Sequence, residues 1–227
     1  MNVRVIIPAF NEQDALGKVL DEIPVDLVRE IIVVDNASTD NTAQIAINLG
    51  VTLLKESRKG YGNACLKAID YIASLDEPTD IVVFLDADYS DYPREMNQLL
   101  KPIVKDNYDL VIGSRALGDK ERGSMTIYQV FGNWLATKLI GIFYHIKFTD
   151  LGPFRAIKFD KLILLSMQDK NYGWTVEMQI KAAKHKLRCV EVPADYRKRI
   201  GFSKVSGTLK GTILAGYKII WTIFKYL

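Results

Sequence analysis

The sequence predicts an α/β fold in which helices flank a mainly parallel sheet. The first observation is the run of five apolar residues at 81–85, which is typical of a strand buried on both faces. The second is the alternation of such runs with segments whose apolar residues recur at helical spacing. The third is the length of 227 residues, which allows one large domain with a sizeable core.

The first 115 residues contain the regular part of this alternation. Helices are expected at residues 15–23, 42–49 and 93–104. A further helix is expected to follow the loop at residues 58–64 and to end at residue 73. Right-handed crossovers then bring the carboxyl ends of parallel strands to one edge of the sheet, where a ligand is expected. The predicted strands are residues 3–8, 30–34, 51–54, 81–85 and 110–115.

Beyond residue 115 the regular alternation stops. A polar loop at residues 117–125 precedes an apolar helix at 127–144. The expected organisation is one domain over residues 1–204 and an amphipathic helix over residues 205–227. The remaining elements are a turn and strand at 149–157, a helix at 174–185, a strand at 187–192 and a basic loop at 197–204.

The carboxyl-terminal segment is basic and apolar. Residues 181–227 hold 11 lysines and arginines against 2 acids, although the whole chain has a net charge of only +3. Apolar residues from Leu209 to Phe224 follow helical spacing, and Lys210 and Lys218 lie among them. This pattern predicts peripheral contact with an anionic membrane surface. Packing of the helix on the core, or in a homodimer, is the alternative that the sequence leaves open.

Composition narrows the chemistry and the compartment. Cys65 and Cys189 lie far apart, and neither they nor the two histidines have metal-ligand spacing, so disulfides and a zinc site are not expected. We expect no signal peptide, because the amino end has no charged-then-apolar leader, and no spanning helix, because the sequence has no uninterrupted apolar run of 18 residues or more. The predicted location is cytoplasmic or on the cytoplasmic membrane face, without a nucleic acid partner.

Two carboxylates, Asp86 and Asp88, follow the strand at residues 81–85. Hard oxygen ligands at a strand end suit Mg²⁺ or Mn²⁺, and the phosphates of a ligand would complete the coordination. The alternative is that Asp88 is a capping or turn residue, since Pro93 marks the start of a helix shortly afterwards.

Six short segments of the sequence form an ordered series. They are residues 8–12, 34–40, 58–64, 86–88, 113–115, and 191–193 together with 199–204. In this order they resemble the motif series of family 2 glycosyltransferases. The nearest branch is similar to dolichyl-phosphate mannosyltransferase, and the resemblance spans about residues 3–210. It implies the GT-A fold of nucleotide-diphospho-sugar transferases, with a Rossmann-like, mixed, mainly parallel sheet, a nucleotide-sugar donor and a divalent metal.

The resemblance also implies which residues bind the nucleotide. Asn36 departs from the family pattern, in which many relatives have a second Asp. Gly60 and Gly62 alone are weak evidence, because an ordinary loop before a helix has the same glycines, and the third glycine of a dinucleotide fingerprint is missing. The predicted nucleotide-binding residues are Pro8, Ala9, Phe10, Asn11, Glu12, Asp35, Arg58, Lys59, Gly62, Asp86 and Ala87.

The same resemblance predicts that Asp86 and Asp88 hold the metal. Close relatives often have Gln where this chain has Ser90, so a third protein ligand is not expected. Arg115, Arg199 and Lys204 are the predicted phosphate-binding cations. Asp88 and Arg199 are also predicted to be catalytic.

The identity of a catalytic base depends on the acceptor. A hydroxyl acceptor needs a carboxylate base, whereas a phosphate monoester is already an anion near neutral pH. Glu177 resembles the position of the base in hydroxyl-using relatives, and Asp150 is the second candidate. A first-turn acid that stabilises its helix is the alternative for Glu177.

The sequence thus predicts an inverting, metal-dependent glycosyltransferase. It would move a hexose from a GDP- or UDP-linked donor, such as GDP-mannose or UDP-glucose, to polyprenyl or dolichyl phosphate. Transfer to a hydroxyl of a glycan or small acceptor is the alternative. A phosphatase of the haloacid dehalogenase type and a catalytically silent nucleotide-sugar-binding protein are more distant.

Overall fold

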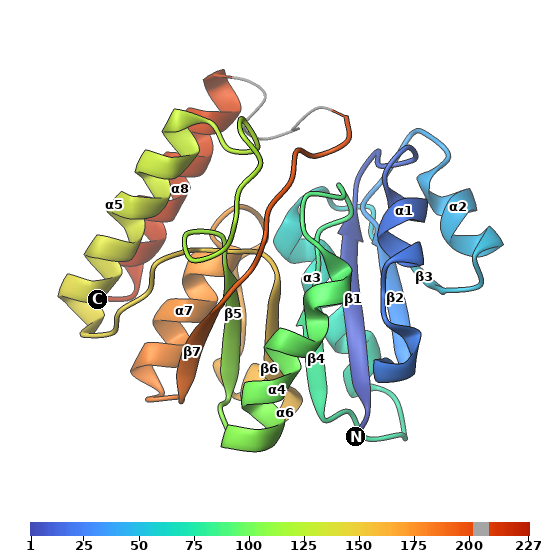
Figure 1. Ribbon diagram of the computed structural model, residues 1–227, viewed down its shortest axis with the longest axis horizontal. Coiled ribbons are helices and arrows are strands. Elements are labelled where there is room, and N and C mark those ends of the chain that lie inside the picture. Colours follow the sequence, from blue (N-terminus) through green and yellow to red (C-terminus); the bar gives the residue numbers. More distant parts are fainter. Residues whose placement is uncertain (202–208) are drawn as a thin grey trace.

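A seven-stranded sheet runs through the computed structural model, which describes residues 1–201 and 209–227 and omits the side chains of residues 209, 210, 212 and 213 (Figure 1). The order across the sheet is β3-β2-β1-β4-β6-β5-β7. The strands are β1 (Val3–Ala9), β2 (Glu30–Asp35), β3 (Thr52–Lys55), β4 (Ile81–Phe84), β5 (Leu110–Ser114), β6 (Arg155–Lys158) and β7 (Cys189–Pro193).

Neighbouring strands pair in parallel except at β6, which runs antiparallel to both β4 and β5. The predicted mixed, mainly parallel sheet is therefore confirmed. Ala9 at the end of β1 lies opposite Asp35 at the end of β2, and Ile6 of β1 lies opposite Phe84 at the end of β4. These registers bring the carboxyl ends of three strands to one edge of the sheet.

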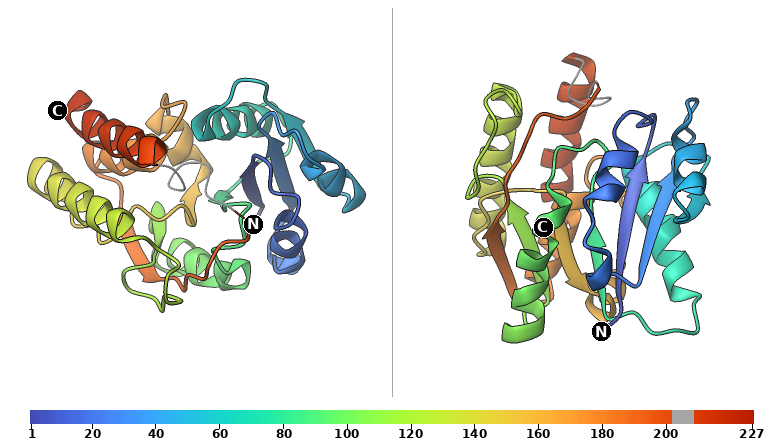
Figure 2. Two further views of the ribbon diagram at one scale, coloured as in Figure 1. Left: turned by 90° about the horizontal axis from the view of Figure 1, so that it is seen from above. Right: turned by 45° about the vertical axis from the view of Figure 1, so that its right-hand side comes forward.

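Two layers of helices cover the sheet (Figure 2). Three helices pack their apolar side chains on one face of the sheet, and five helices pack theirs on the opposite face. Two 3-10 turns, η1 (Val25–Leu27) and η2 (Pro93–Glu95), complete the elements. The three helices on the first face are α1 (Leu16–Asp21), α2 (Thr42–Asn48) and α4 (Met96–Asp106). The five on the opposite face are α3 (Tyr61–Ala73), α5 (Ile127–Tyr144), α6 (Phe159–Leu165), α7 (Trp174–Lys184) and α8 (Leu209–Lys225).

The structure departs from the predicted elements in a few places. The helix predicted at residues 93–104 begins as η2 and continues as α4. The strand predicted at residues 81–85 ends at Phe84. Helix α6 was not predicted. It directly follows the antiparallel strand β6 and buries Leu162 and Leu165 against the sheet.

Helix α8 lies beside α5 on the flank of the domain (Figures 1 and 2). The hydroxyl of Tyr144 donates to the carbonyl of Ile223 over 2.6 Å, and the rings of Phe143 and Phe224 are 5.5 Å apart. Ile223 is fully buried, so one face of α8 packs on the core. Packing on the core is the alternative to membrane contact that the sequence left open. In the described part of the chain, no helix combines the length and apolar character that a membrane crossing needs.

Candidate active site

Charged side chains collect where the strands end. Asp86 follows β4 and Arg115 follows β5, and the loop after β1 carries Glu12. The amino terminus lies at the opposite end of the sheet (Figure 1). The segment after β7 returns to the site edge and carries Arg199.

Three carboxyl groups, Asp86, Asp88 and Asp91, form what we call the acidic cluster. Asp88 is 7% exposed and Asp91 is 2% exposed. Oδ1 of Asp86 is buried and has no hydrogen-bond partner within the described residues. Burial and the neighbouring charge of Asp88 raise the pKa of Asp86 to about 7. The cluster therefore stores electrostatic repulsion that a cation would relieve.

Arg199 joins the acidic cluster to the loop after β1. Its guanidinium lies 3.1 Å from Oδ2 of Asp88 and donates to Oε1 of Glu12 over 3.0 Å. The other oxygen of Asp88 accepts the backbone N–H and the hydroxyl of Ser90. Asp88 is thus held in a fixed orientation, and Arg199 occupies one of its oxygens.

The donor set fits a hard divalent cation. Asp86 and Asp88 offer carboxylate oxygens, and Oδ1 of Asp86 is a buried acceptor that receives no hydrogen bond from the part of the chain that the structure describes. Among the residues that the structure describes, no group of three or more His, Cys, Asp or Glu side chains has metal-binding geometry. A cation here would therefore take its remaining ligands from phosphate and water, and Arg199 would have to yield its place on Asp88.

Asp91 is a site residue that the sequence reasoning missed. Both of its carboxyl oxygens are buried without a hydrogen-bond partner in the described chain. Burial, followed by the charges of Asp86 and Asp88, raises its pKa well above the ordinary value. The available signal was a third acid within six residues, which looked like part of the turn before Pro93.

Arg115 and Asp150 form a buried ion pair beside the acidic cluster. The guanidinium binds both carboxylate oxygens at 2.7 Å, and the backbone N–H of Arg115 adds a third bond. Asp150 is 1% exposed, and the ring of Tyr196 lies 5.0 Å from the guanidinium. Because Asp150 is occupied by Arg115, this environment does not fit its predicted role as a base.

Glu177 does not join the site. Its fully buried carboxylate accepts the backbone N–H groups of Gln168 and Asp169, and the hydroxyl of Tyr226. Nζ of Lys181 pairs with it at 2.8 Å. The predicted base therefore has neither access to an acceptor nor a free oxygen. Glu177 instead ties α7 to the preceding loop and to the chain end, a correction that required the tertiary contacts.

The predicted nucleotide residues lie around the ends of β1 and β2. Oδ1 of Asp35 accepts the N–H of Ser38, and Oδ1 of Asn11 accepts the N–H of Thr39. Nζ of Lys59 lies 4.8 Å from the centre of the Phe10 ring. These contacts bring residues 8–12, the loop after β2 and residue 59 together. Pro8, Ala9 and Glu12 belong to the first of these segments. Ala87 is buried directly after β4.

The loop before α3 is fixed by the protein itself. Asn36 donates to the carbonyls of Glu56 and Arg58 and accepts the N–H of Gly60. An aspartate cannot donate, so the departure at Asn36 has a structural reason. The Arg58 guanidinium binds Glu56 and lowers the pKa of that carboxyl to about 2.

Gly62 packs against another loop of the protein. A Cβ atom at this position would lie 1.9 Å from the carbonyl oxygen of Asp169. The glycine is therefore needed for internal packing, and close approach to a nucleotide remains a prediction. Lys204, the third predicted phosphate-binding cation, lies outside the described residues.

A groove of about 740 Å³ adjoins the Arg115–Asp150 pair. Trp134 and Ile142 of α5 supply apolar wall, and Lys120, Lys138 and Lys147 line it as cations. None of the predicted nucleotide residues lines it. The groove therefore lies on the β5 side of the acidic cluster, and the predicted nucleotide-binding residues lie on the β1 side.

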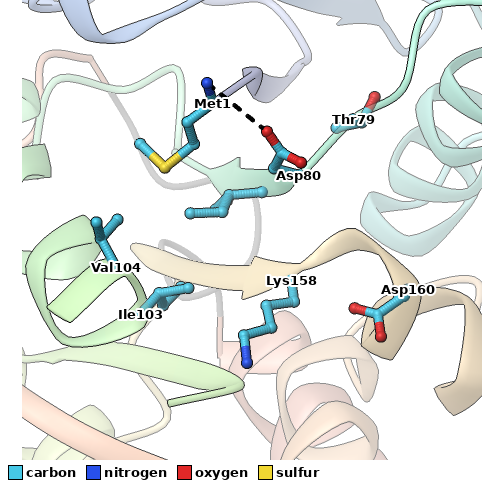
Figure 3. A pocket seen from close by; sticks show the side chains of 8 residues that line it. Met1, Thr79, Asp80, Ile103, Val104, Lys158 and Asp160 are labelled. Carbon is cyan, nitrogen blue, oxygen red and sulfur yellow. Dashed lines mark ion pairs between the residues drawn. The ribbon is translucent and has the colours of Figure 1, made fainter. Parts of the chain in front are cut away.

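A smaller pocket of about 380 Å³ lies at the opposite edge of the sheet (Figure 3). The terminal ammonium of Met1 pairs with Asp80, and Lys158 pairs with Asp109. None of the predicted site residues that the structure describes lines this pocket. We therefore assign no part of the site to it.

The comparison with known families decides the identity of this arrangement. The model of glycosyl transferase family 2 matches residues 4–164. The chain belongs to glycosyl transferase family 2. It is accordingly a glycosyltransferase, and the predicted family and its branch are confirmed.

Relatives of this family 2 enzyme match over nearly the whole chain. An uncharacterized glycosyltransferase of Mycobacterium tuberculosis is 33% identical over 94% of each chain. The undecaprenyl-phosphate mannosyltransferase of Micrococcus luteus is 29% identical over 93% of this chain and 90% of its own.

A solved structure gives the fold independently. Glucosyl-3-phosphoglycerate synthase from Mycobacterium tuberculosis, in complex with Mn²⁺, UDP and phosphoglyceric acid, has a TM-score of 0.77 at 22% identity. The match covers 99% of this chain and 78% of that chain. At this identity the likeness shows the fold alone, and the GT-A fold predicted for this family 2 enzyme is confirmed.

Proposed function

We propose that this family 2 enzyme is an inverting, metal-dependent transferase that moves a hexose from a nucleoside-diphosphate sugar to polyprenyl phosphate. One observation carries the proposal. The acidic cluster, with its orphaned carboxyl oxygens, lies between the nucleotide residues on the β1 side and an apolar, lysine-lined groove on the β5 side. Donor and acceptor would then meet at the cluster.

On the donor side, the base and ribose would lie by Asp35 and residues 8–12, as in other sites at the ends of parallel strands. Asp86 and Asp88 would hold Mg²⁺ or Mn²⁺, and Arg199 would leave Asp88 to pair with the diphosphate. The cation, when bound, would stabilise the charge that develops on the leaving nucleoside diphosphate. The solved neighbour, which shares this fold, was crystallised with Mn²⁺ and UDP, so a fold of this kind accommodates both.

On the acceptor side, a phosphate fits the residues better than a hydroxyl does. Asp150 is bound by Arg115, and Glu177 is saturated by its donors, so neither is a free base. A phosphate monoester, with a second pKa of about 6, attacks as an anion without one. Lys120, Lys138 and Lys147 line the groove and would attract the phosphate. The relative that acts on undecaprenyl phosphate supports this acceptor class.

The test has two steps. A thermal-shift panel of GDP, UDP, GDP-mannose and UDP-glucose, with and without Mn²⁺, identifies the donor. Transfer of the labelled hexose is then measured to polyprenyl phosphate and, as a matched control, to the same polyprenol without phosphate. We expect transfer to the phosphate only. Equal transfer to both, or stabilisation by none of the nucleotides, would contradict the proposal.

We further propose that α5 and α8 place the enzyme on the membrane surface. Their outer faces expose Phe131 and Trp134 on α5, and Tyr217 and Trp221 on α8. Nζ of the exposed Lys225 lies 5.4 Å from the Trp221 ring, so cationic and aromatic groups share this surface. A homodimer through the same faces is the competing outcome.

Deletion of α8 would be a poor test of membrane contact, because Ile223 and Tyr226 support the core. A double variant, Tyr217→Ser with Trp221→Ser, changes exposed side chains instead. We expect roughly tenfold weaker binding to vesicles of anionic phospholipid, because the variant has less aromatic surface to bury in the membrane. Unchanged vesicle binding, or a monomer produced from a wild-type dimer, would count against the membrane assignment.

A further inference from the structure

Asp91 has a carboxyl group that the described protein leaves without a partner. The residue is 2% exposed, and neither oxygen has a hydrogen-bond donor or acceptor among the described residues. Native proteins rarely leave buried polar atoms in this state, since the lost hydration is not replaced. A buried carboxyl group that lacks internal partners is therefore a candidate for binding a ligand.

The backbone around Asp91 is firmly held. Arg197 donates to the carbonyls of Tyr89 and Asp91 and pairs with Glu22. Asp91 also forms an isolated bridge with Tyr196 from the segment after β7. Three of these contacts, two from Arg197 and one from Tyr196, thus hold the backbone of the loop that carries Asp91.

The position of Asp91 lies between the two halves of the site. It shares a loop with Asp86 and Asp88 on the donor side. On the acceptor side it forms a bridge with Tyr196, whose ring lies 5.0 Å from the Arg115 guanidinium. The donor diphosphate would lie at Asp86 and Asp88, and the groove begins at Arg115. The group transferred from one to the other must pass through the space between them.

We propose that Asp91 binds hydroxyl groups of the hexose that is transferred. This inference rests on the proposed function and names the sugar-binding residue of that site. Each sugar hydroxyl both donates and accepts hydrogen bonds, and two carboxyl oxygens can serve two neighbouring hydroxyls. The competing role, a third metal ligand, is disfavoured because the described acids do not form a three-residue metal group.

The test compares a nucleoside diphosphate with its hexose conjugate. Calorimetric titration with Mn²⁺ present measures UDP against UDP-glucose, or GDP against GDP-mannose, on the wild type and on Asp91→Asn. We expect Asp91→Asn to bind the nucleoside diphosphate with an affinity within about twofold of wild type. The hexose conjugate should bind the variant at least tenfold more weakly than it binds the wild type. A donor that lacks the hydroxyl group contacted by Asp91 should bind the wild type more weakly than the full donor does. Its affinity for Asp91→Asn should be no lower than its affinity for the wild type. Asp106→Asn, at the exposed end of α4, is the matched control.

Each other outcome is decisive. Equal loss of diphosphate and conjugate binding in Asp91→Asn, with normal thermal unfolding, would make Asp91 a metal ligand and overturn the inference. Unchanged binding of the conjugate would overturn it as well, while leaving the proposed function intact. Failure of the wild type to bind any nucleotide or conjugate would overturn the proposed function, and the inference with it.

Discussion

Asp91 and Glu177 are both buried acids, but the protein surrounds them in opposite ways. Glu177 lies in the first turn of α7 and receives two backbone N–H groups, a phenol and an ammonium. Asp91 lies at the ends of β4 and β5 and receives no hydrogen bond from the described chain. A buried acid that the protein satisfies stabilises the fold, whereas an unsatisfied one is available to a ligand.

The same contrast separates the two regions to which these acids belong. The helical region around Glu177 has its charges paired, as Lys218 with Asp169 also shows. The acidic cluster keeps like charges together, which destabilises the folded chain until a cation or other ligand arrives. Substitutions in the two regions should therefore separate activity from stability.

The largest effect is expected at Asp88. Asp88→Asn should lower hexose transfer by roughly 10³-fold, because a charge that holds the cation is lost. Thermal unfolding should change little, since relief of repulsion with Asp86 offsets the lost pair with Arg199. Initial rates at saturating donor and Mn²⁺, with a melting curve of the same sample, provide the measurement. Full activity in the variant would break the contrast between the regions.

Glu177→Gln should show the reverse pattern. We expect the free energy of unfolding to fall by about 3 kcal/mol, because Lys181 loses its buried partner. Transfer per folded molecule should stay within about twofold of wild type. Urea unfolding and active-site-normalised rates provide the two readings. An inactive but stable variant would instead indicate that Glu177 is a base and that the acceptor is a hydroxyl.

The smallest effect concerns pH. Burial, followed by the charge of Asp88, raises the pKa of Asp86 to about 7 from an unfolded value of about 4. The folded chain then holds a proton that the unfolded chain releases between these values, so stability falls as pH rises from 4 to 7 and levels off above 7. The contribution should be on the order of 2 kcal/mol after allowance for partial solvation.

Asp86→Asn should remove this part of the slope. It should also reduce the contribution of Asp91, which has the same sign, because the charge of Asp86 adds to burial in raising the pKa of Asp91. Urea unfolding of both proteins at several pH values, without added metal, measures the difference. Parallel curves for the two proteins would show that Asp86 is ionised throughout and that the acidic cluster is less strained than we infer.

Periodicity and motif order were sufficient for the fold and the family. The apolar run before Asp86 and the alternation of strands and helices depend on local side-chain patterns, which a linear sequence displays directly. The antiparallel course of β6 and the presence of α6 depend on pairing across the sheet, and periodicity does not report pairing partners.

The roles of individual acids divide along the same line. The sequence by itself determined that Asp86 and Asp88 follow a buried strand, because strand burial and residue order are local properties. Only the tertiary structure decided that Glu177 is saturated, that Asp150 is bound by Arg115 and that Asp91 lacks a partner among residues 1–201 and 209–227. Hydrogen-bond donors for these carboxylates come from residues distant in the chain, and whether an acid is satisfied or free depends on which of them the fold brings within 3 Å or so.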